Sequence, residues 1–302
     1  MSAELPPTLD PVAAKRWQHS PPAGSPWLHE EVARRMEERL QWIKLAPQSW
    51  CHWEPLQGGI AAHRALSQRY PGAACFVVEP DARRSAAAAL ALHKPWWNPA
   101  HWNAPALHFV PPGDGAVQML WSNMALHMAA DPQALLQSWQ RALAPDGFLM
   151  FSCLGPDTLR GLREAWRAAG WPPPAHAFTD MHDWGDMLVS SGFAEPVMDM
   201  ERITLTFAGP QRALQELRGL GRNMHVARFG GLRGRDWLAA MGQLLGPAVP
   251  MASDQIALEF EVIYGHAFKA RPRLTMKSET ILSLEEMRHV LQQGRATPGG
   301  RA

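Results

Sequence analysis

The stretch of sequence that decides the fold runs from Gly115 to Trp171: GAVQMLWSNMALHMAADPQALLQSWQRALAPDGFLMFSCLGPDTLRGLREAWRAAGW. It begins with a mostly apolar run, residues 116–121, of the kind that forms a strand buried on both faces. Asp131-Pro132 is typical of a helix N-cap and first helical position, and leucine and tryptophan then recur at helical spacing. The turn residues 145–147 precede a second apolar run, residues 148–153. Strand, helix and strand in this order indicate a crossover unit of a parallel sheet with helices on both faces.

The bulk composition is that of an ordinary globular protein. The chain has 302 residues, of which 46% are hydrophobic, and a net charge of +1. This charge gives no reason to expect binding to nucleic acid or to an anionic membrane. The three cysteines show no CxxC pairing, which favours a reducing compartment. No apolar run approaches the ~18 residues of a membrane span, and no apolar signal core precedes Trp17. We therefore expect a cytoplasmic protein without a membrane or nucleic-acid partner.

Several segments carry a resemblance to a known family. Residues 121–128 (WSNMALHM) and 143–166 (LAPDGFLMFSCLGPDTLRGLREAW) resemble class I S-adenosylmethionine-dependent methyltransferases. Within that superfamily they are most similar to the malonyl-acyl-carrier-protein O-methyltransferases of biotin synthesis. Residues 178–207 and 259–269 match the same family, so that the resemblance spans roughly residues 26–269. It implies a Rossmann-like α/β fold, with a seven-stranded mixed sheet, helices on both faces and a helical cap.

The domain organisation follows from the same resemblance and from composition. We expect a flexible N-terminal segment at residues 1–25, a methyltransferase-like domain at 26–290 and a disordered tail at 291–302. The cap helices, at about 209–246, are expected between the last two strands of the sheet.

A helix is predicted from Pro26 onward, with a charged outer face. Its charges are spaced four residues apart in the pairs Glu30/Arg34, Glu31/Arg35 and Arg34/Glu38, a spacing at which opposite charges attract on a helix surface.

The segment at residues 49–59 (SWCHWEPLQGG) lies where the family carries its cofactor loop. There the first strand ends in an acid, and glycines let the backbone approach the cofactor. Here His52 replaces the acid and residues 54–56 replace small residues, which leaves Gly58 and Gly59 as candidate cofactor-binding residues. Two interpretations stay open: a modified cofactor loop, or an ordinary turn from strand to helix.

Further candidate cofactor-binding residues follow later strands. Glu79 ends the apolar strand 75–78 and lies 20 residues after Gly59, the spacing at which an acid reaches ribose hydroxyls in nucleotide-binding sheets. The alternative for Glu79 is a surface carboxylate at a strand end. Trp121 and Ser122, at the end of the strand predicted from residue 116, complete the set.

The third strand is expected at residues 106–110, where the family also has an acid that receives the adenine amino group. Residues 94–113 contain no acid, and we hypothesise that Trp96, Trp97 and Trp102 fill the adenine site. No metal site is expected, because the histidines of this region are irregularly spaced and have no carboxylate or thiol nearby.

The expected acceptor chemistry requires a cation. A malonyl carboxylate is ionised at pH 7, so its methylation needs no general base. Arg160 and Arg163, just after the predicted strand 148–153, are candidate substrate-binding residues for the free carboxylate, and a solvated helix face is their alternative role. Asn123 and His127 are candidate catalytic residues, because they follow the predicted strand 116–121. For His127 the alternative is a partly buried structural histidine.

Two functions follow from these observations. The first is an S-adenosylmethionine-dependent methyltransferase acting on malonyl-acyl-carrier protein, with that carrier as its protein partner. The second is a catalytically inactive pseudo-methyltransferase with a binding or regulatory role, for which the altered residues 49–59 and the missing adenine acid argue.

Overall fold

The computed structural model describes residues 9–20, 24–93, 106–231, 233–248 and 255–271. The chain divides into two compact units, residues 1–270 and 271–302, and the fold below is that of the first. Trp96, Trp97 and Trp102 and the predicted tail at 291–302 lie outside the described residues.

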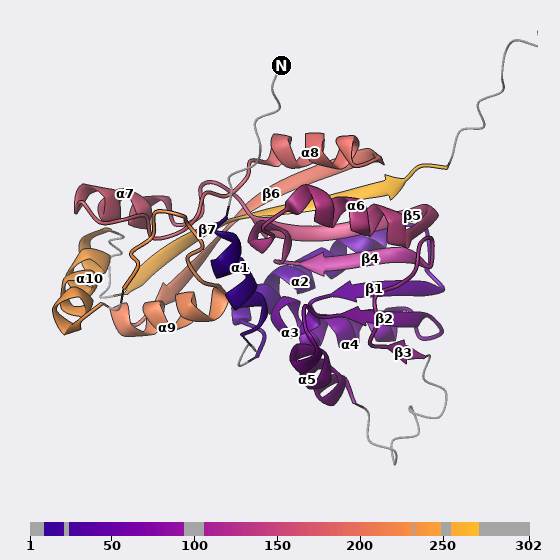
Figure 1. Ribbon diagram of the computed structural model, residues 1–302, viewed down its shortest axis with the longest axis horizontal. Coiled ribbons are helices and arrows are strands. Elements are labelled where there is room, and N and C mark those ends of the chain that lie inside the picture. Colours follow the sequence, from indigo (N-terminus) through magenta and orange to yellow (C-terminus); the bar gives the residue numbers. More distant parts are fainter. Residues whose placement is uncertain (1–8, 21–23, 94–105, 232, 249–254, 272–302) are drawn as a thin grey trace, which may run out of the picture. The chain divides into compact units, whose positions relative to one another are not determined.

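The described part of the chain forms a seven-stranded sheet in the order β3-β2-β1-β4-β5-β7-β6 (Figure 1). The strands are β1 (Ser49–Trp53), β2 (Ala74–Val78), β3 (Leu107–His108), β4 (Val117–Asn123), β5 (Leu143–Leu154), β6 (Phe193–Phe207) and β7 (Ile256–Lys269). Neighbouring strands are parallel except at β7, which runs antiparallel to both β5 and β6. The predicted mixed sheet is confirmed.

Helices connect these strands. They are α1 (Pro11–Gln18), α2 (Trp27–Arg39), α3 (Pro55–Gly58), α4 (Ile60–Arg69), α5 (Ala82–Leu92), α6 (Pro132–Ala142), α7 (Arg160–Ala168), α8 (Met181–Ser190), α9 (Pro210–Leu220) and α10 (Arg235–Ala248), with short 3-10 turns at η1 (Leu40–Trp42) and η3 (Leu126–Met128). The Asp131 side chain accepts a hydrogen bond from the Ala134 amide at 2.9 Å, as expected for the N-cap of α6. Within the described ranges, no helix has the length and apolar character needed to cross a membrane.

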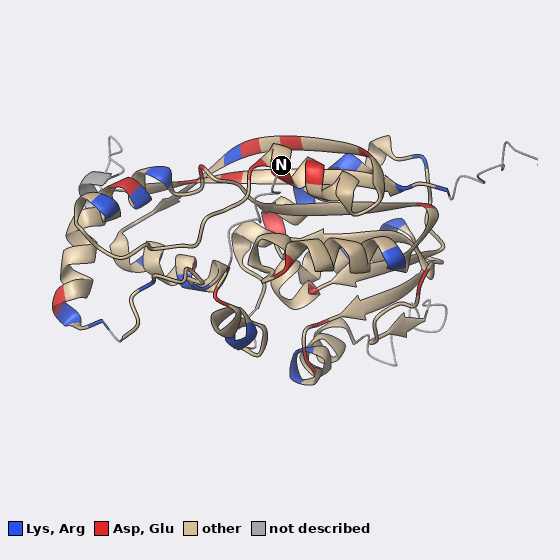
Figure 2. Ribbon diagram, turned by 45° about the horizontal axis from the view of Figure 1, so that its top comes forward, with Lys and Arg blue, Asp and Glu red and all other residues tan. Residues whose placement is uncertain are grey.

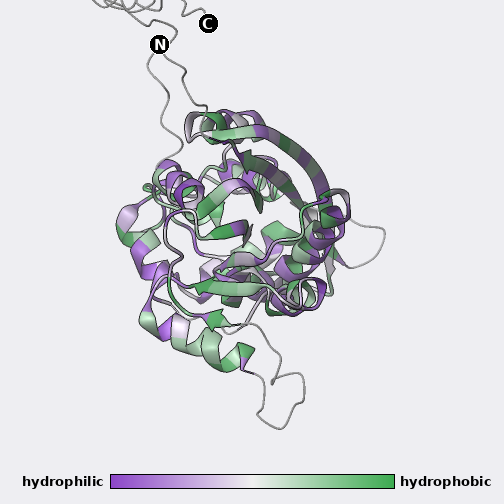
Figure 3. Cartoon of the chain, turned by 90° about the vertical axis from the view of Figure 1, so that its right-hand side faces the viewer, coloured by the Kyte–Doolittle hydropathy of each residue, from purple (hydrophilic) through white to green (hydrophobic). Residues whose placement is uncertain are grey.

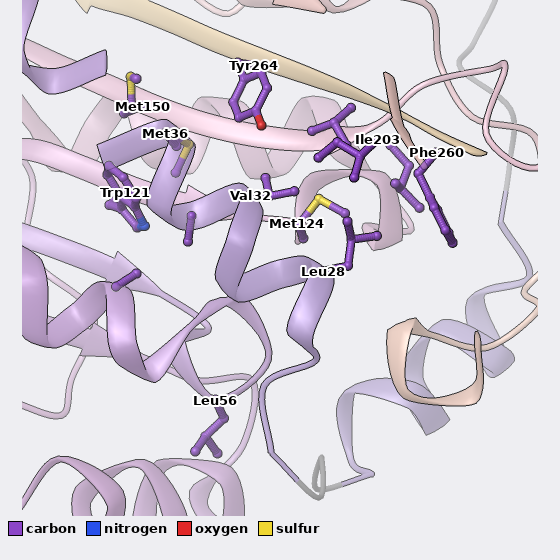
Figure 4. Close-up of a cluster of buried hydrophobic side chains, with 14 of the residues drawn as sticks. Leu28, Val32, Met36, Leu56, Trp121, Met124, Met150, Ile203, Phe260 and Tyr264 are labelled. Atoms are coloured by element: carbon purple, nitrogen blue, oxygen red, sulfur yellow. The ribbon is translucent and has the colours of Figure 1, made fainter. Parts of the chain in front are cut away.

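Apolar side chains fill the space on both faces of the sheet. Leu28, Val32 and Met36 of α2 form one cluster with Trp121 of β4 (Figure 4), to which α4 and α5 also contribute. On the other face α6 and α8 pack their leucines and tryptophans on β4 and β5. In Figure 3 hydrophobic colours dominate the central strands. Burial of each large apolar side chain stabilises the fold by about 1.5–3 kcal/mol.

Two predicted strands differ from the observed ones. The third strand is limited to the two residues of β3, which pair with Cys75 and Phe76. The strand expected at 148–153 begins earlier, at Leu143, because that residue already pairs with Val117. The predicted turn at 145–147 is retained inside β5 as an irregularity, with Asp146 at φ 62°.

The charge pairs on α2 are only partly as predicted. Glu31 pairs with Arg35 at 2.7 Å and Arg34 with Glu38 at 2.5 Å. The Glu30/Arg34 prediction is wrong. The Glu30 carboxylate instead accepts a hydrogen bond from the amide of Ile60 at 2.9 Å, at the N-terminus of α4, where a negative charge is stabilised.

One cross-strand pair in the antiparallel part of the sheet is unusually close. Gly265 of β7 lies opposite Phe151 of β5, and a Cβ atom at Gly265 would overlap the phenylalanine ring. The missing side chain therefore makes room for the ring.

The carboxyl ends of the parallel strands meet at one edge of the sheet, where ligands bind in open α/β folds. Three non-glycine residues just beyond these ends adopt left-handed backbone conformations: Glu54 after β1 (φ 54°), Met124 after β4 (φ 57°) and Leu159 after β5 (φ 55°). Such conformations cost about 1–3 kcal/mol each and cluster at functional sites. This edge is therefore the candidate site.

Candidate functional site

A cavity of about 280 Å³ lies beyond the carboxyl end of β5. Its walls come from η3, the end of β5, α7, the segment 174–178 and α9. Most of the lining is apolar, with Leu154, Leu162, Phe178 and Phe260 among its members. The polar side chains among the lining residues include histidines and arginines, so the cavity combines an apolar wall with donors and positive charge.

Arg163 is the predicted substrate residue that lines this cavity. One of its Nη groups donates to the carbonyl oxygen of Pro156, while its Nε is buried and has no hydrogen-bond partner among the described residues. Burial lowers the pKa of Arg163, but a guanidinium remains charged in proteins. Arg160 is placed differently, because it pairs with Asp157, is 60% exposed and is absent from the lining.

His127 also lines the cavity, in contact with a second histidine. Its Nδ1 accepts a hydrogen bond from the Leu154 amide at 3.4 Å, and His176 Nε2 lies 3.1 Å from the His127 carbonyl oxygen. Burial holds the pKa of His127 well below its usual value and lowers that of His176 to about 4. Both rings are therefore neutral at pH 7, so the positive charge of the cavity comes from arginines, among them the half-buried Arg163.

Asn123, Ser122 and Trp121 lie at the end of β4, away from the cavity lining. The Asn123 amide donates to the carbonyl oxygens of Gly58 and His29, the latter at 2.8 Å, and its oxygen accepts from Ser152 Oγ at 2.6 Å. Asn123 thus ties α2, α3 and β5 to the end of β4. Ser122 and Trp121 are fully buried, and the Trp121 ring belongs to the core beneath α2.

Glu79, at the end of β2, is engaged in a buried ion pair. Its side chain is 0% exposed, and one carboxylate oxygen lies 2.9 Å from Arg84 Nε. The other accepts a hydrogen bond from the Leu56 amide at 2.9 Å. Arg84 also reaches Glu54 at 3.3 Å. One guanidinium serves two carboxylates, and burial raises the pKa of Glu54 to about 7 and also raises that of Glu79.

Gly58 and Gly59 end the one-turn helix α3 and join it to α4. A Cβ atom at Gly58 would lie 2.8 Å from the Asn123 carbonyl oxygen, so only glycine allows this approach to β4. Gly59 has φ 137°, which also favours glycine. Segment 49–59 is therefore a strand and a helical turn packed on the end of β4.

The residue types expected to bind S-adenosylmethionine are present after β1 and β2, but their arrangement in this structure does not leave them accessible to it. An acid after β2 and a glycine at the β1 edge are present. However, the Glu79 carboxylate is 0% exposed and paired with Arg84, and the turn at Gly58 is packed against Asn123.

Four residues at or near the site are not among the candidates predicted from the sequence: Arg84, His176, Arg218 and Arg222. Arg218 and Arg222 belong to the cavity lining and form no ion pair among the described residues. The sequence signal for these two residues is the high arginine content of residues 212–235, within the predicted cap. For Arg84 the signal was its position five residues after Glu79, in the first turn of a helix capped by Asp81.

The chain matches known methyltransferases over most of its length. Residues 57–151 match the family model described as a methyltransferase domain. A malonyl-[acyl-carrier protein] O-methyltransferase from Gallionella capsiferriformans is 36% identical over 263 residues, covering 84% of this chain and 88% of that protein. The protein of the same name from Nitrosospira multiformis is 34% identical and covers 87% and 88%. Because these relatives are named as enzymes, the comparisons give no support to an inactive pseudo-methyltransferase.

Solved structures agree with the fold. The YcgJ protein of Bacillus subtilis aligns with a TM-score of 0.50 at 13% identity, covering 80% of this chain and 99% of that one. A candidate methyltransferase from Bacillus halodurans C-125 gives the same TM-score and identity and covers 80% and 100%. The chain therefore belongs to the malonyl-[acyl-carrier protein] O-methyltransferase family, and it is an S-adenosylmethionine-dependent O-methyltransferase with the class I fold.

Proposed function

We propose that this enzyme methylates the free carboxylate of a malonyl group carried as a thioester on an acyl-carrier protein, in the synthesis of biotin. The names of the relatives support this substrate, and the chemistry of the cavity agrees with it. We further propose that the reaction takes place in the cytoplasm, which the free thiols of Cys51, Cys75 and Cys153 support.

The reaction joins an acceptor oxygen to a methyl carbon. S-adenosylmethionine, when bound, supplies an electrophilic methyl group on sulfur; a C–O bond forms as the C–S bond breaks, and no proton is transferred. The protein therefore has to bind, align and desolvate the carboxylate. A general base is unnecessary, in agreement with the neutral and hydrogen-bonded His127.

The observation that carries the proposal is Arg163 in an apolar cavity. Its buried Nε–H has no partner among the described residues, and a carboxylate would satisfy it through a charge-assisted hydrogen bond. The apolar walls suit the acyl chain and exclude water, which strengthens that bond. We assign His127 and Asn123 to positioning: His127 through the wall of the cavity, Asn123 by joining the strand ends.

The carrier itself would meet the outer surface of the cap. The basic residues coloured blue on α7, α9 and the connection to α10 in Figure 2 are all arginines, with some carboxylates between them. Arg218 and Arg222 line the cavity, and their side chains are exposed. An acyl-carrier protein presents its acyl group on a phosphate-bearing arm, and these arginines suit that phosphate.

The test compares Arg163→Met with Arg160→Ala on malonyl-acyl-carrier protein. Loss of a hydrogen bond to a charged group costs about 1.5–3 kcal/mol, so kcat/KM should fall about 10- to 150-fold in Arg163→Met. Arg160 is exposed and outside the cavity, so the control should stay within about twofold of the parent enzyme. The methyl ester is measured on the intact carrier by mass spectrometry. Equal rates for the Met variant and the parent would refute the assignment of Arg163.

A further inference from the structure

Arg84 is a buried arginine in an unusual environment. It lies in the first turn of α5, its side chain is 1% exposed, and its guanidinium is held between Glu79 and Glu54. Its Nη1 is buried without a hydrogen-bond partner in the described part of the chain. Burial of an arginine with an unpartnered N–H is costly, and here two carboxylates compete for one guanidinium.

The two carboxylates differ in accessibility. Glu79 is 0% exposed, and its oxygens are taken by Arg84 and by the Leu56 amide. The side chain of Glu54 is 17% exposed, and its carboxylate lies 3.3 Å from an Nη atom of Arg84. Glu54 directly follows β1 and has a strained, left-handed backbone conformation. Glu79 is the acid expected to receive ribose hydroxyls, yet its carboxylate is 0% exposed and paired with Arg84, so it is not accessible to a ligand in this arrangement.

A second, independent observation concerns the segment after β1. α3 is pressed on the end of β4, with the Asn123 amide bound to the Gly58 carbonyl oxygen and no room for a Cβ at Gly58. The Leu56 amide, which binds Glu79, belongs to the same turn. The ion pair and the closed turn are therefore joined through one hydrogen bond.

We propose that Arg84 competes with S-adenosylmethionine for Glu79, and that the cofactor binds only when the guanidinium leaves Glu79 and stays on Glu54. The structure is the closed arrangement. Arg84 thereby sets the affinity for the cofactor: the apparent dissociation constant is the intrinsic one divided by the fraction of molecules in which Glu79 is free.

The experiment measures binding of S-adenosylhomocysteine by calorimetry to the parent protein, Glu54→Gln and the double variant Arg84→Met/Glu54→Gln. The double variant removes the competitor together with its second carboxylate partner, so the formal net charge of the three-residue cluster is unchanged. If Glu79 is free in about one molecule in ten, the double variant should bind about tenfold more tightly than the parent. Glu54→Gln alone keeps Arg84 but weakens its alternative contact with residue 54. Arg84 should then stay on Glu79 more often, so S-adenosylhomocysteine should bind more weakly than to the parent. Adding Glu79→Gln to the double variant should abolish the gain.

Tighter binding cannot arise from a general loss of packing, which would weaken it. A folded double variant that binds no more tightly than the parent, or the absence of binding by both, would overturn the proposal. Should the double variant fail to fold, 15N-arginine labelling of the parent gives a second reading. The Nε–H signal of Arg84, identified by its loss in Arg84→Lys, should shift during titration with S-adenosylhomocysteine, and an unchanged signal at saturation contradicts the proposal. Binding of this ligand needs no acceptor, so the outcome is independent of the substrate proposed above.

Discussion

Glu30 shows how a tertiary neighbour can decide the role of a single side chain. From its helix alone it is a surface partner for Arg34, but its carboxylate accepts hydrogen bonds from the Ile60 amide at 2.9 Å and the Ala61 amide at 3.3 Å. It therefore caps α4, whose own N-cap residue is Gly59 and has no side chain to do so.

We expect Glu30→Ala to lower the free energy of unfolding by about 0.5–2 kcal/mol, because the first amides of α4 lose their acceptor. Glu38→Ala is the matched control, since Glu38 is 57% exposed and its partner among the described residues, Arg34, is similarly exposed. Its cost should be at most about 0.5 kcal/mol. Urea denaturation followed by circular dichroism measures both, and equal losses would argue against the cap.

At the scale of elements, α1 is attached to the rim of the cavity. The Asp10 amide donates to the Met224 carbonyl oxygen at 2.9 Å, and the Asp10 carboxylate pairs with Arg228 at 2.6 Å. Trp17 is buried and packs in one cluster with Met224. The segment 222–228 therefore depends on α1 for its order.

This dependence predicts a local effect of Trp17→Ala. Amide hydrogen exchange at residues 223–228 should quicken about tenfold or more, which corresponds to about 1.4 kcal/mol of lost local stability, while amides of β4 and β5 keep their protection. Val12→Ala serves as the control, because Val12 lies on α1 but is 55% exposed. Uniform quickening across the sheet would instead mean that Trp17 supports the whole fold.

The same scale shows what the sequence could predict. The strand predicted at 116–121 and the helix predicted from Pro26 agree with β4 and α2 to within a few residues, because local pattern and burial agree there. The helical turn α3 and the two-residue β3 depend on contacts with distant segments and have no local period. At the site, the ends of the predicted strands indicated candidate residues such as Glu79 and Asn123. The Arg84–Glu79 ion pair, in contrast, is a tertiary contact that sequence spacing alone does not reveal.

Considered as a whole, the molecule buries several neutral histidines. Burial lowers the pKa of His29 and of His176 to about 4, and holds those of His52 and His127 well below the usual value. The unfolded chain binds protons at these rings near pH 6.5, and the folded chain does not. The stability that these neutral rings contribute is therefore fully present above about pH 6.5 and is lost as the pH falls toward 4.

His29→Asn isolates one such ring. His29 Nδ1 lies 2.8 Å from the Gln57 carbonyl oxygen, and the asparagine amide can donate the same hydrogen bond without titrating. Between pH 7 and pH 5 the parent should lose about 2 kcal/mol more unfolding free energy than this variant. Glu54, whose pKa is raised to about 7, acts in the opposite direction, and the difference between variants removes it.

Urea denaturation at several pH values gives the comparison. If His29→Asn loses as much unfolding free energy between pH 7 and pH 5 as the parent does, His29 is not the buried neutral base that the structure describes.

The contact between Gly265 and Phe151 constrains the history open to this chain. A side chain cannot arise at position 265 while the ring remains, because the two would occupy the same space. Loss of the ring alone leaves a hole in the core beneath an uncovered glycine. The two positions are therefore expected to change together in evolution, because a substitution at either one alone would destabilise the fold.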